Sequence, residues 1–128
     1  MDYVEATQKW LERYAEINLS KIKMEHDLID APVGTPDEEE ERVNKISGEL
    51  LRMETLVKKL DDALDRLEEI EDAETKFLIE SHYKTGVPLK DLSKIADLPE
   101  TMIRKKLERG VKIMAGLLYG VALDFMRD

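Results

Sequence analysis

An apolar heptad pattern in the middle of the chain constrains its fold more than any other sequence feature. Its eight members recur at alternating steps of three and four residues: Val43, Ile46, Leu50, Met53, Val57, Leu60, Leu64 and Leu67. This spacing places all of them on one side of an α-helix. A stripe of that length must face another helix, because it would not be soluble if it were exposed to water. We therefore predict a helix over 36–72 and assign the eight residues to oligomerisation.

A second long helix is expected before it, over 2–30. Apolar residues recur in this segment every seven positions: Tyr3, Trp10, Ile17 and Met24. Two prolines and a glycine in 31–36 end the helix, and Thr35 with Glu38 forms a capping-box pattern that starts the next one. The heptad stripe can face this first helix, folded back as a hairpin, or the same helix of another copy. A hairpin that also dimerises satisfies both.

Shorter helices are expected beyond residue 73, where the heptad spacing stops. The first of them ends near Gly86, because glycine commonly ends helices. The second covers 89–97, and its apolar spacing places Leu92 and Ile95 on the inward side.

A tight turn at Leu98 and Pro99 precedes a third helix, which opens at about Glu100. Its inward face is expected to contain Ile103, Leu107, Val111, Met114 and Leu118. Two helices joined in this way form a helix-turn-helix pattern. The predicted fold is all-α, with long antiparallel or oligomeric coiled-coil helices in an acidic region, 1–73, and a C-terminal helix-turn-helix region, 74–128.

The charge of the chain is unevenly distributed. The chain has 20 Lys and Arg against 29 Asp and Glu, a net charge of −9. Residues 76–112 nevertheless carry nine basic and five acidic side chains, whereas 1–75 carry ten and twenty-two. Phosphate groups respond to charge within a Debye length of about 8–10 Å, so the local excess matters more than the total. We therefore predict that the third helix binds double-stranded DNA.

The predicted DNA contacts lie mainly on the outward face of this third helix. Side chains near the start of such a helix reach base edges in the major groove, and later ones lie along phosphates. The candidates for bases are Thr101, Arg104 and Lys105, flanked by Met102, and those for phosphates are Lys90, Arg109 and Lys112.

The segment 77–110 contains a Tyr-x-x-Gly sequence at 83–86 and a Leu-x-x-Ile-Ala helix at 92–96. In these motifs it resembles the region-4 helix-turn-helix of sigma factors. Two positions depart from the family pattern: Asp97 replaces the turn glycine and Pro99 replaces the capping serine. We expect Asp97 to tolerate a left-handed backbone, and we expect the helix after Pro99 to lack a side-chain cap.

The linker 27–36 and the acidic helix after it are similar to small bacteriophage transcriptional regulators of the ArpU/RinA type. This resemblance implies a phage or prophage protein associated with late gene expression, and RNA polymerase is a candidate partner. The function expected from both resemblances is sequence-specific transcriptional regulation by a DNA-binding dimer or tetramer.

Two alternatives remain open at this point. One is a small terminase subunit for DNA packaging, although such subunits usually place the helix-turn-helix before the coil. The other is a modulator that binds RNA polymerase or a repressor through the acidic coil.

Enzyme and metal-binding functions are not expected. The chain has no P-loop, G-x-G-x-x-G, H-E-x-x-H or G-x-S-x-G motif, and its two histidines, His26 and His82, fall in different elements. The absence of cysteine excludes disulfides and cysteine-based zinc sites. The five acidic side chains at 37–41 follow a helix start and point in different directions around the helix, so they cannot converge on one ion. Their position favours helix capping and solvation over a metal site. We expect no cofactor and no metal.

The C-terminal segment is unusually apolar but short. The stretch 113–126 has 14 residues, fewer than the ~20 that a membrane span needs, and it includes Asp124. Gly116 and Gly120 would permit close helix packing, against either a second subunit or the rest of the chain. The first ten residues are acidic and polar, unlike a signal peptide, so we expect a cytoplasmic protein of a bacterial host cell.

Overall fold

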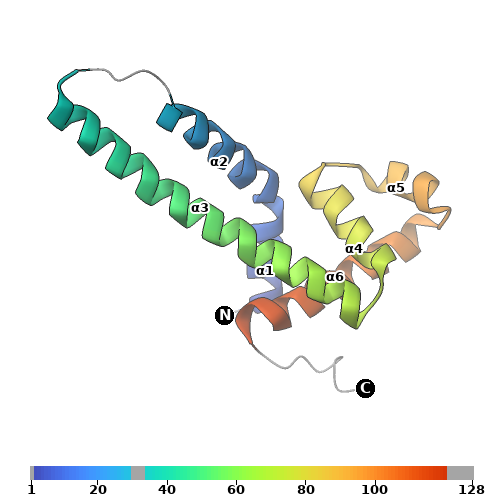
Figure 1. Cartoon of the computed structure of the whole chain (residues 1–128). Helices are drawn as coiled ribbons and strands as arrows, with labels where there is room; N and C mark the ends of the chain where they lie inside the picture. Colours follow the sequence, from blue (N-terminus) through green and yellow to red (C-terminus); the bar gives the residue numbers. More distant parts are fainter. Residues whose placement is uncertain (1, 30–33, 121–128) are drawn as a thin grey trace. The chain divides into compact units, whose positions relative to one another are not determined.

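The computed structural model describes residues 2–29 and 34–120, and the elements in this part of the chain are all helical (Figure 1). They are α1 (Tyr3–Glu12), α2 (Tyr14–Ile29), α3 (Pro36–Ile70), α4 (Ala73–Ile79), the π-helical segment η1 (Glu80–Lys84), α5 (Leu89–Ala96) and α6 (Glu100–Tyr119). The described ranges contain no strand, which confirms the predicted all-α class. The helices divide into two compact units. One contains residues 16–58, and the other contains the described residues of 1–15 and 59–128.

The 16–58 unit is a helical hairpin in which α2 and the first part of α3 lie side by side (Figure 1). The predicted capping box is present, since the Glu38 backbone N–H donates to Thr35 Oγ1 at 3.3 Å and the Thr35 N–H donates to Glu38 Oε2 at 3.2 Å. Arg42 Nη1 donates to the Asp27 carbonyl oxygen at 2.8 Å and joins the two helices. Four heptad residues in this unit are half-buried: Val43, Ile46, Leu50 and Met53.

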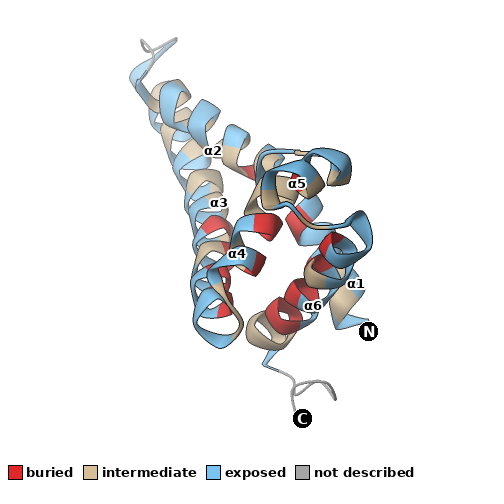
Figure 2. Ribbon diagram, turned by 90° about the vertical axis from the view of Figure 1, so that its right-hand side faces the viewer, coloured by how far each residue is buried: buried red, intermediate tan, exposed pale blue. Residues whose placement is uncertain are grey.

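The other unit has a larger hydrophobic core, contributed by five helices and α2's first residue. Figure 2 shows buried residues concentrated in α4, α6 and the last turns of α3. The largest apolar side chains in this core are Leu11, Tyr14, Leu60, Leu64, Leu67, Leu78, Ile79, Leu92, Ile103, Leu107, Val111, Ile113 and Met114. The predicted boundary at residue 73 therefore differs from the division into units, because the end of α3 shares its core with α4 to α6.

The predicted single helix over 2–30 is wrong in one respect, since it is interrupted at Arg13. Trp10 is 37 % exposed, although the seven-residue spacing predicted it to be inward. The buried side of α1 carries Thr7 and Leu11 instead, where α1 packs against α6. Thr7 tolerates burial because its hydroxyl donates to the Tyr3 carbonyl oxygen at 2.7 Å. The seven-residue spacing gave a wrong inward face for α1 because it was extended across Arg13, where the helix is interrupted.

Gly110 allows α4 and α6 to approach each other closely. A Cβ atom added at this position would lie 2.9 Å from Thr75 Cγ2 and 3.1 Å from Ile79 Cδ1. The sequence predicted close packing of this kind at Gly116 and Gly120. Gly120 instead lies at the end of α6 with φ +66°, and a Cβ atom added there would meet no atom within 4 Å.

We expect Gly110→Ala to lower the free energy of unfolding by about 1–3 kcal/mol, because the new methyl group overpacks the α4–α6 contact. Thr75→Ser removes the nearest methyl group, so Gly110→Ala with Thr75→Ser should cost less than the sum of the two single changes. Urea unfolding of the four proteins measures this coupling. Additive costs would show that the contact with Thr75 is not the cause.

Asp72 starts α4 by accepting a hydrogen bond from the Thr75 backbone N–H at 2.6 Å. Hydrogen bonds from Thr75 are the main reason that the pKa of Asp72 lies below 3.8, and nearby Lys106 lowers it further. The charged form is therefore favoured by folding, so its contribution to stability is complete above the unfolded pKa and is lost as the pH falls through the lower folded pKa.

We expect Asp72→Ala to lower the free energy of unfolding by ~1 kcal/mol at pH 7, because α4 loses its N-terminal cap. The difference from the unmodified chain should persist at pH 5 and shrink below pH 3.8. Asp72→Asn keeps the capping oxygen without titrating, and it is the matched control. Urea midpoints at several pH values measure the effect, and a difference that does not change with pH would contradict it.

Candidate nucleic-acid interface

The turn between α5 and α6 is held by backbone and side-chain hydrogen bonds. Asp97 adopts the left-handed conformation, with φ 54° and ψ 48°, as the sequence predicted. The Leu98 N–H donates to the Ser93 carbonyl oxygen at 3.1 Å, and the Ser93 hydroxyl donates back to the Leu98 carbonyl oxygen. Helix α6 then begins at Glu100 after Pro99, and no side chain caps it, which was also predicted.

The inward side of α6 matches the predicted apolar face. Ile103, Leu107, Val111 and Met114 are buried, and Leu118 is partly buried. The inward side of α5 corrects one prediction, because Leu92 is fully buried but Ile95 is 60 % exposed. With only two turns, α5 buries a single narrow stripe through Leu89, Leu92 and Ala96, and Ile95 lies beyond its edge.

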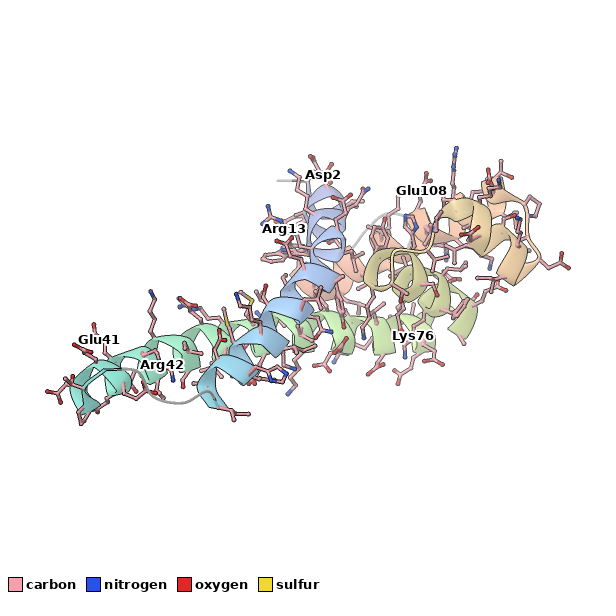
Figure 3. All side chains as sticks on the ribbon, turned by 90° about the horizontal axis from the view of Figure 1, so that it is seen from above. Asp2, Arg13, Glu41, Arg42, Lys76 and Glu108 are labelled. Atoms are coloured by element: carbon pink, nitrogen blue, oxygen red, sulfur yellow. The ribbon has the colours of Figure 1, made fainter. Side chains whose placement is uncertain are left out.

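The candidate DNA-contacting residues are all exposed. They are Lys90 in the first turn of α5 and Thr101, Met102, Arg104, Lys105, Arg109 and Lys112 in α6. Helical periodicity places Thr101, Lys105 and Lys112 on one stripe, opposite the buried Ile103 and Leu107. Glu108 lies on this stripe as well and projects outward (Figure 3). Two of the three predicted base contacts, Thr101 and Lys105, thus lie together on the outward stripe of α6.

Arg104 lies at one edge of this face. It lines a cavity of about 360 Å³ beside α6, together with Val4 and Gln8 of α1. Lys112 lines the same cavity two turns further along. Because successive residues of a helix lie about 100° apart around its axis, Arg104 is offset from Lys105 and from the centre of the outward stripe, although its predicted role is a base contact.

The opposite edge of α6 is bound to acidic residues that sequence reasoning did not connect with it. Arg109 forms an ion pair with Glu71 through its Nε atom. Lys106 Nζ lies 2.9 Å from Glu74 Oε1 and 3.9 Å from Asp72 Oδ2. The hydrogen bond to Glu74 is the main cause of the raised pKa of Lys106. These carboxylates oppose phosphate binding on this edge, since they compensate the positive charge there.

Lys76 also contributes less to the positive field than its charge suggests. Its Nζ atom lies 3.0 Å from Asp65 Oδ1, 3.1 Å from Glu68 Oε2 and 3.8 Å from Glu80 Oε1. Hydrogen bonds to Asp65 and Glu68 raise the pKa of Lys76. The end of α3 thus neutralises part of the basic segment. Only the density of acidic residues over 61–74 hinted at this in the sequence.

The heptad residues assigned to oligomerisation fall into two groups. Leu60, Leu64 and Leu67 are at most 3 % exposed and lie in the core of their own chain, and Val57 is 7 % exposed. The other four residues, Val43, Ile46, Leu50 and Met53, are half-buried. A contact between copies through this stripe stays a prediction, and the second group has more accessible surface for it.

Within the described ranges, no cluster of three or more potential metal ligands occurs. His82 Nδ1 lies 2.9 Å from the Val87 carbonyl oxygen and holds the segment after η1. No described helix is long and apolar enough to cross a membrane. Residues 121–126 of the predicted apolar C-terminal stretch lie outside the described residues. Comparison of the chain with protein-family models, curated proteins and solved structures finds no match.

Proposed function

We propose that this chain is a sequence-specific DNA-binding transcriptional regulator, encoded by a phage or prophage, that binds DNA as an oligomer. The observation that carries the proposal is the exposed outward stripe of α6, which carries Lys105 and Lys112 beside Glu108 and starts directly after a three-residue turn from α5. A polar helix face presented in this way fits the major groove of DNA. We infer that α5 and α6 act as a helix-turn-helix of the sigma region-4 type.

The chemistry of the face favours DNA in two ways. Thr101 and Lys105 lie in the first two turns of α6, where side chains reach base edges. The N-terminus of α6 has no side-chain cap, so its backbone N–H groups and helix dipole favour a phosphate there. Lys90 and Lys112 supply charge for phosphates on either side.

Selection of bound fragments from sheared bacterial and phage DNA tests the proposal, at low and at physiological salt. A few enriched sites with a shared motif at both salts are the expected result, and the spacing of half-sites would report the arrangement of subunits. Retention only at low salt and without a motif would reveal a general phosphate binder and contradict sequence specificity. The absence of any retention would overturn DNA binding altogether.

A second candidate function is contact with a partner protein through the 16–58 unit. Large apolar side chains are exposed on α2, including Leu19 at 67 % and Ile29 at 82 %. Exposed apolar patches rimmed by polar residues are typical of protein-binding surfaces. A pull-down that succeeds with Lys105→Glu, a variant expected to lose DNA binding, would favour this candidate. A mass of eight or more copies in solution would instead favour a small terminase subunit.

A further inference from the structure

One exposed face of α3 consists of an acidic, an uncharged and a basic zone. Helical periodicity places these residues on the side roughly opposite the heptad stripe. The face begins with acidic residues, continues with uncharged ones and ends with a basic one: Glu40 and Glu41, then Asn44, Gly48, Leu51 and Thr55, then Lys58. All seven are exposed, and Leu51 is 65 % exposed.

The neutral zone has the features of a packing surface. Leu51 projects beside Gly48, and a Cβ atom added to Gly48 would meet no atom within 4 Å. Gly48 therefore leaves room for a large side chain from another molecule. The Thr55 hydroxyl donates to the Leu51 carbonyl oxygen at 2.8 Å, so its burial would leave no unsatisfied donor.

The charged zones have no ion-pair partners among the residues that the structure describes. No described residue lies within ion-pair distance of Glu41 or of Lys58. Figure 3 shows Glu41 projecting outward from α3. An acidic start and a basic end make this face complementary to itself after a half-turn rotation, which is the requirement for a two-fold contact between identical chains.

We propose that this face of α3 binds the same face of a second copy of the chain, with the two helices antiparallel. A two-fold axis between residues 49 and 50 places Leu51 over Gly48 of the second copy. The same axis places Glu41 opposite Lys58 of the second copy, twice in the dimer. A parallel pair would instead bring Glu41 against Glu41. Beyond the paired segment, Asp37 and Asp62 face each other at the rim, where the charges are exposed and screened by salt.

This inference deepens the oligomeric part of the proposed function and is independent of DNA recognition. It assigns self-association to a face that the heptad pattern did not identify. Its test uses the full chain without DNA, so failure of the dimer contact and failure of DNA binding are separate outcomes.

Light scattering coupled to size-exclusion chromatography measures the first expected result, a mass twice the 14.8 kDa of one chain. Leu51→Glu should raise the dimer dissociation constant by at least about tenfold, because it places a charge in the buried centre of the contact. Ile70→Glu is the matched control, since Ile70 is 52 % exposed at the end of α3, outside the paired segment, and the charge change is identical. A monomeric chain, or a dimer weakened only by Ile70→Glu, would overturn the proposal.

A charge exchange tests the register. Glu41→Lys and Lys58→Glu should each weaken the dimer roughly fivefold, since each brings like charges together at two places. The combined variant should regain most of the lost affinity, because the opposite charges face each other again. Loss that is additive in the combined variant would contradict the pairing of Glu41 with Lys58.

The absence of cysteine from the chain makes the orientation measurable. Asn44→Cys and Thr55→Cys place thiols at positions that face each other only in the antiparallel arrangement. A short bismaleimide cross-linker should join a mixture of the two variants and leave each variant alone largely uncoupled. Efficient cross-linking of Asn44→Cys to itself would indicate parallel helices and overturn the proposed geometry.

Discussion

Lys105→Glu is expected to reduce the affinity for a selected DNA site on the order of 100-fold. Loss of one good base contact costs about 1–3 kcal/mol, and the introduced carboxylate adds repulsion from the phosphates. Lys105 lies at the centre of the exposed stripe of α6, opposite the buried Leu107. The substitution should therefore leave the core and the helical content unchanged.

Lys23→Glu is the matched control, because Lys23 is an exposed lysine on α2, in the 16–58 unit. It changes the net charge of the chain by the same amount and should alter the affinity little. Fluorescence anisotropy with a labelled site, over a range of salt concentrations, measures both variants. Equal losses of DNA affinity in the two variants would indicate a general effect of charge. Unchanged affinity in Lys105→Glu would contradict the assignment of α6 as the DNA-binding helix.

Arg109 offers an internal comparison on the same helix. Its ion pair with Glu71 already compensates the guanidinium charge. Its predicted phosphate contact must therefore compete with this carboxylate, and we expect Arg109 to matter less for DNA affinity than Lys105.

Leu67→Ala is expected to destabilise the protein far more than Leu50→Ala, although the two leucines belong to the same heptad stripe of one helix. Leu67 is 0 % exposed in the large core, so truncation leaves a cavity and should cost about 2–5 kcal/mol. Leu50 is half-buried in the hairpin, so truncation removes less buried area and should cost ~1 kcal/mol.

The single tryptophan of the chain makes the two effects separable. Trp10 lies in the same unit as Leu67, whereas Leu50 lies in the other unit. Leu67→Ala should shift the urea midpoint seen by Trp10 fluorescence, and Leu50→Ala should act mainly on the circular dichroism signal of the helices. Equal shifts of the fluorescence midpoint by both variants would contradict the division of the heptad between two environments.

Local signals in the sequence predicted the ends of several helices correctly. Thr35 and Glu38 form their capping box, Asp97 adopts the left-handed conformation, and α6 starts after Pro99. Each of these features depends on hydrogen bonds or backbone preferences within about four residues. The same is true of the all-α class, which follows from helix-forming segments and few breakers.

The choice of buried face was less predictable wherever it depended on distant partners. The spacing of apolar residues predicted that Trp10 and Ile95 face inward. Both are exposed, because α1 and α5 turn other residues toward the core. The ion pair of Arg109 with Glu71 joins residues 38 positions apart. No local pattern could connect these two side chains.

The sequence by itself thus determined the helical class, the positions of most breaks and the residues that make the outward side of α6. Only the tertiary structure decided how the continuous heptad of α3 is shared, with Leu60, Leu64 and Leu67 in a core with α4 to α6 and the earlier residues in a hairpin. The physical reason is that helix formation and capping arise from neighbours along the chain. Burial and charge pairing instead depend on which surfaces meet after folding, and many amphipathic helices offer more than one surface of similar apolarity.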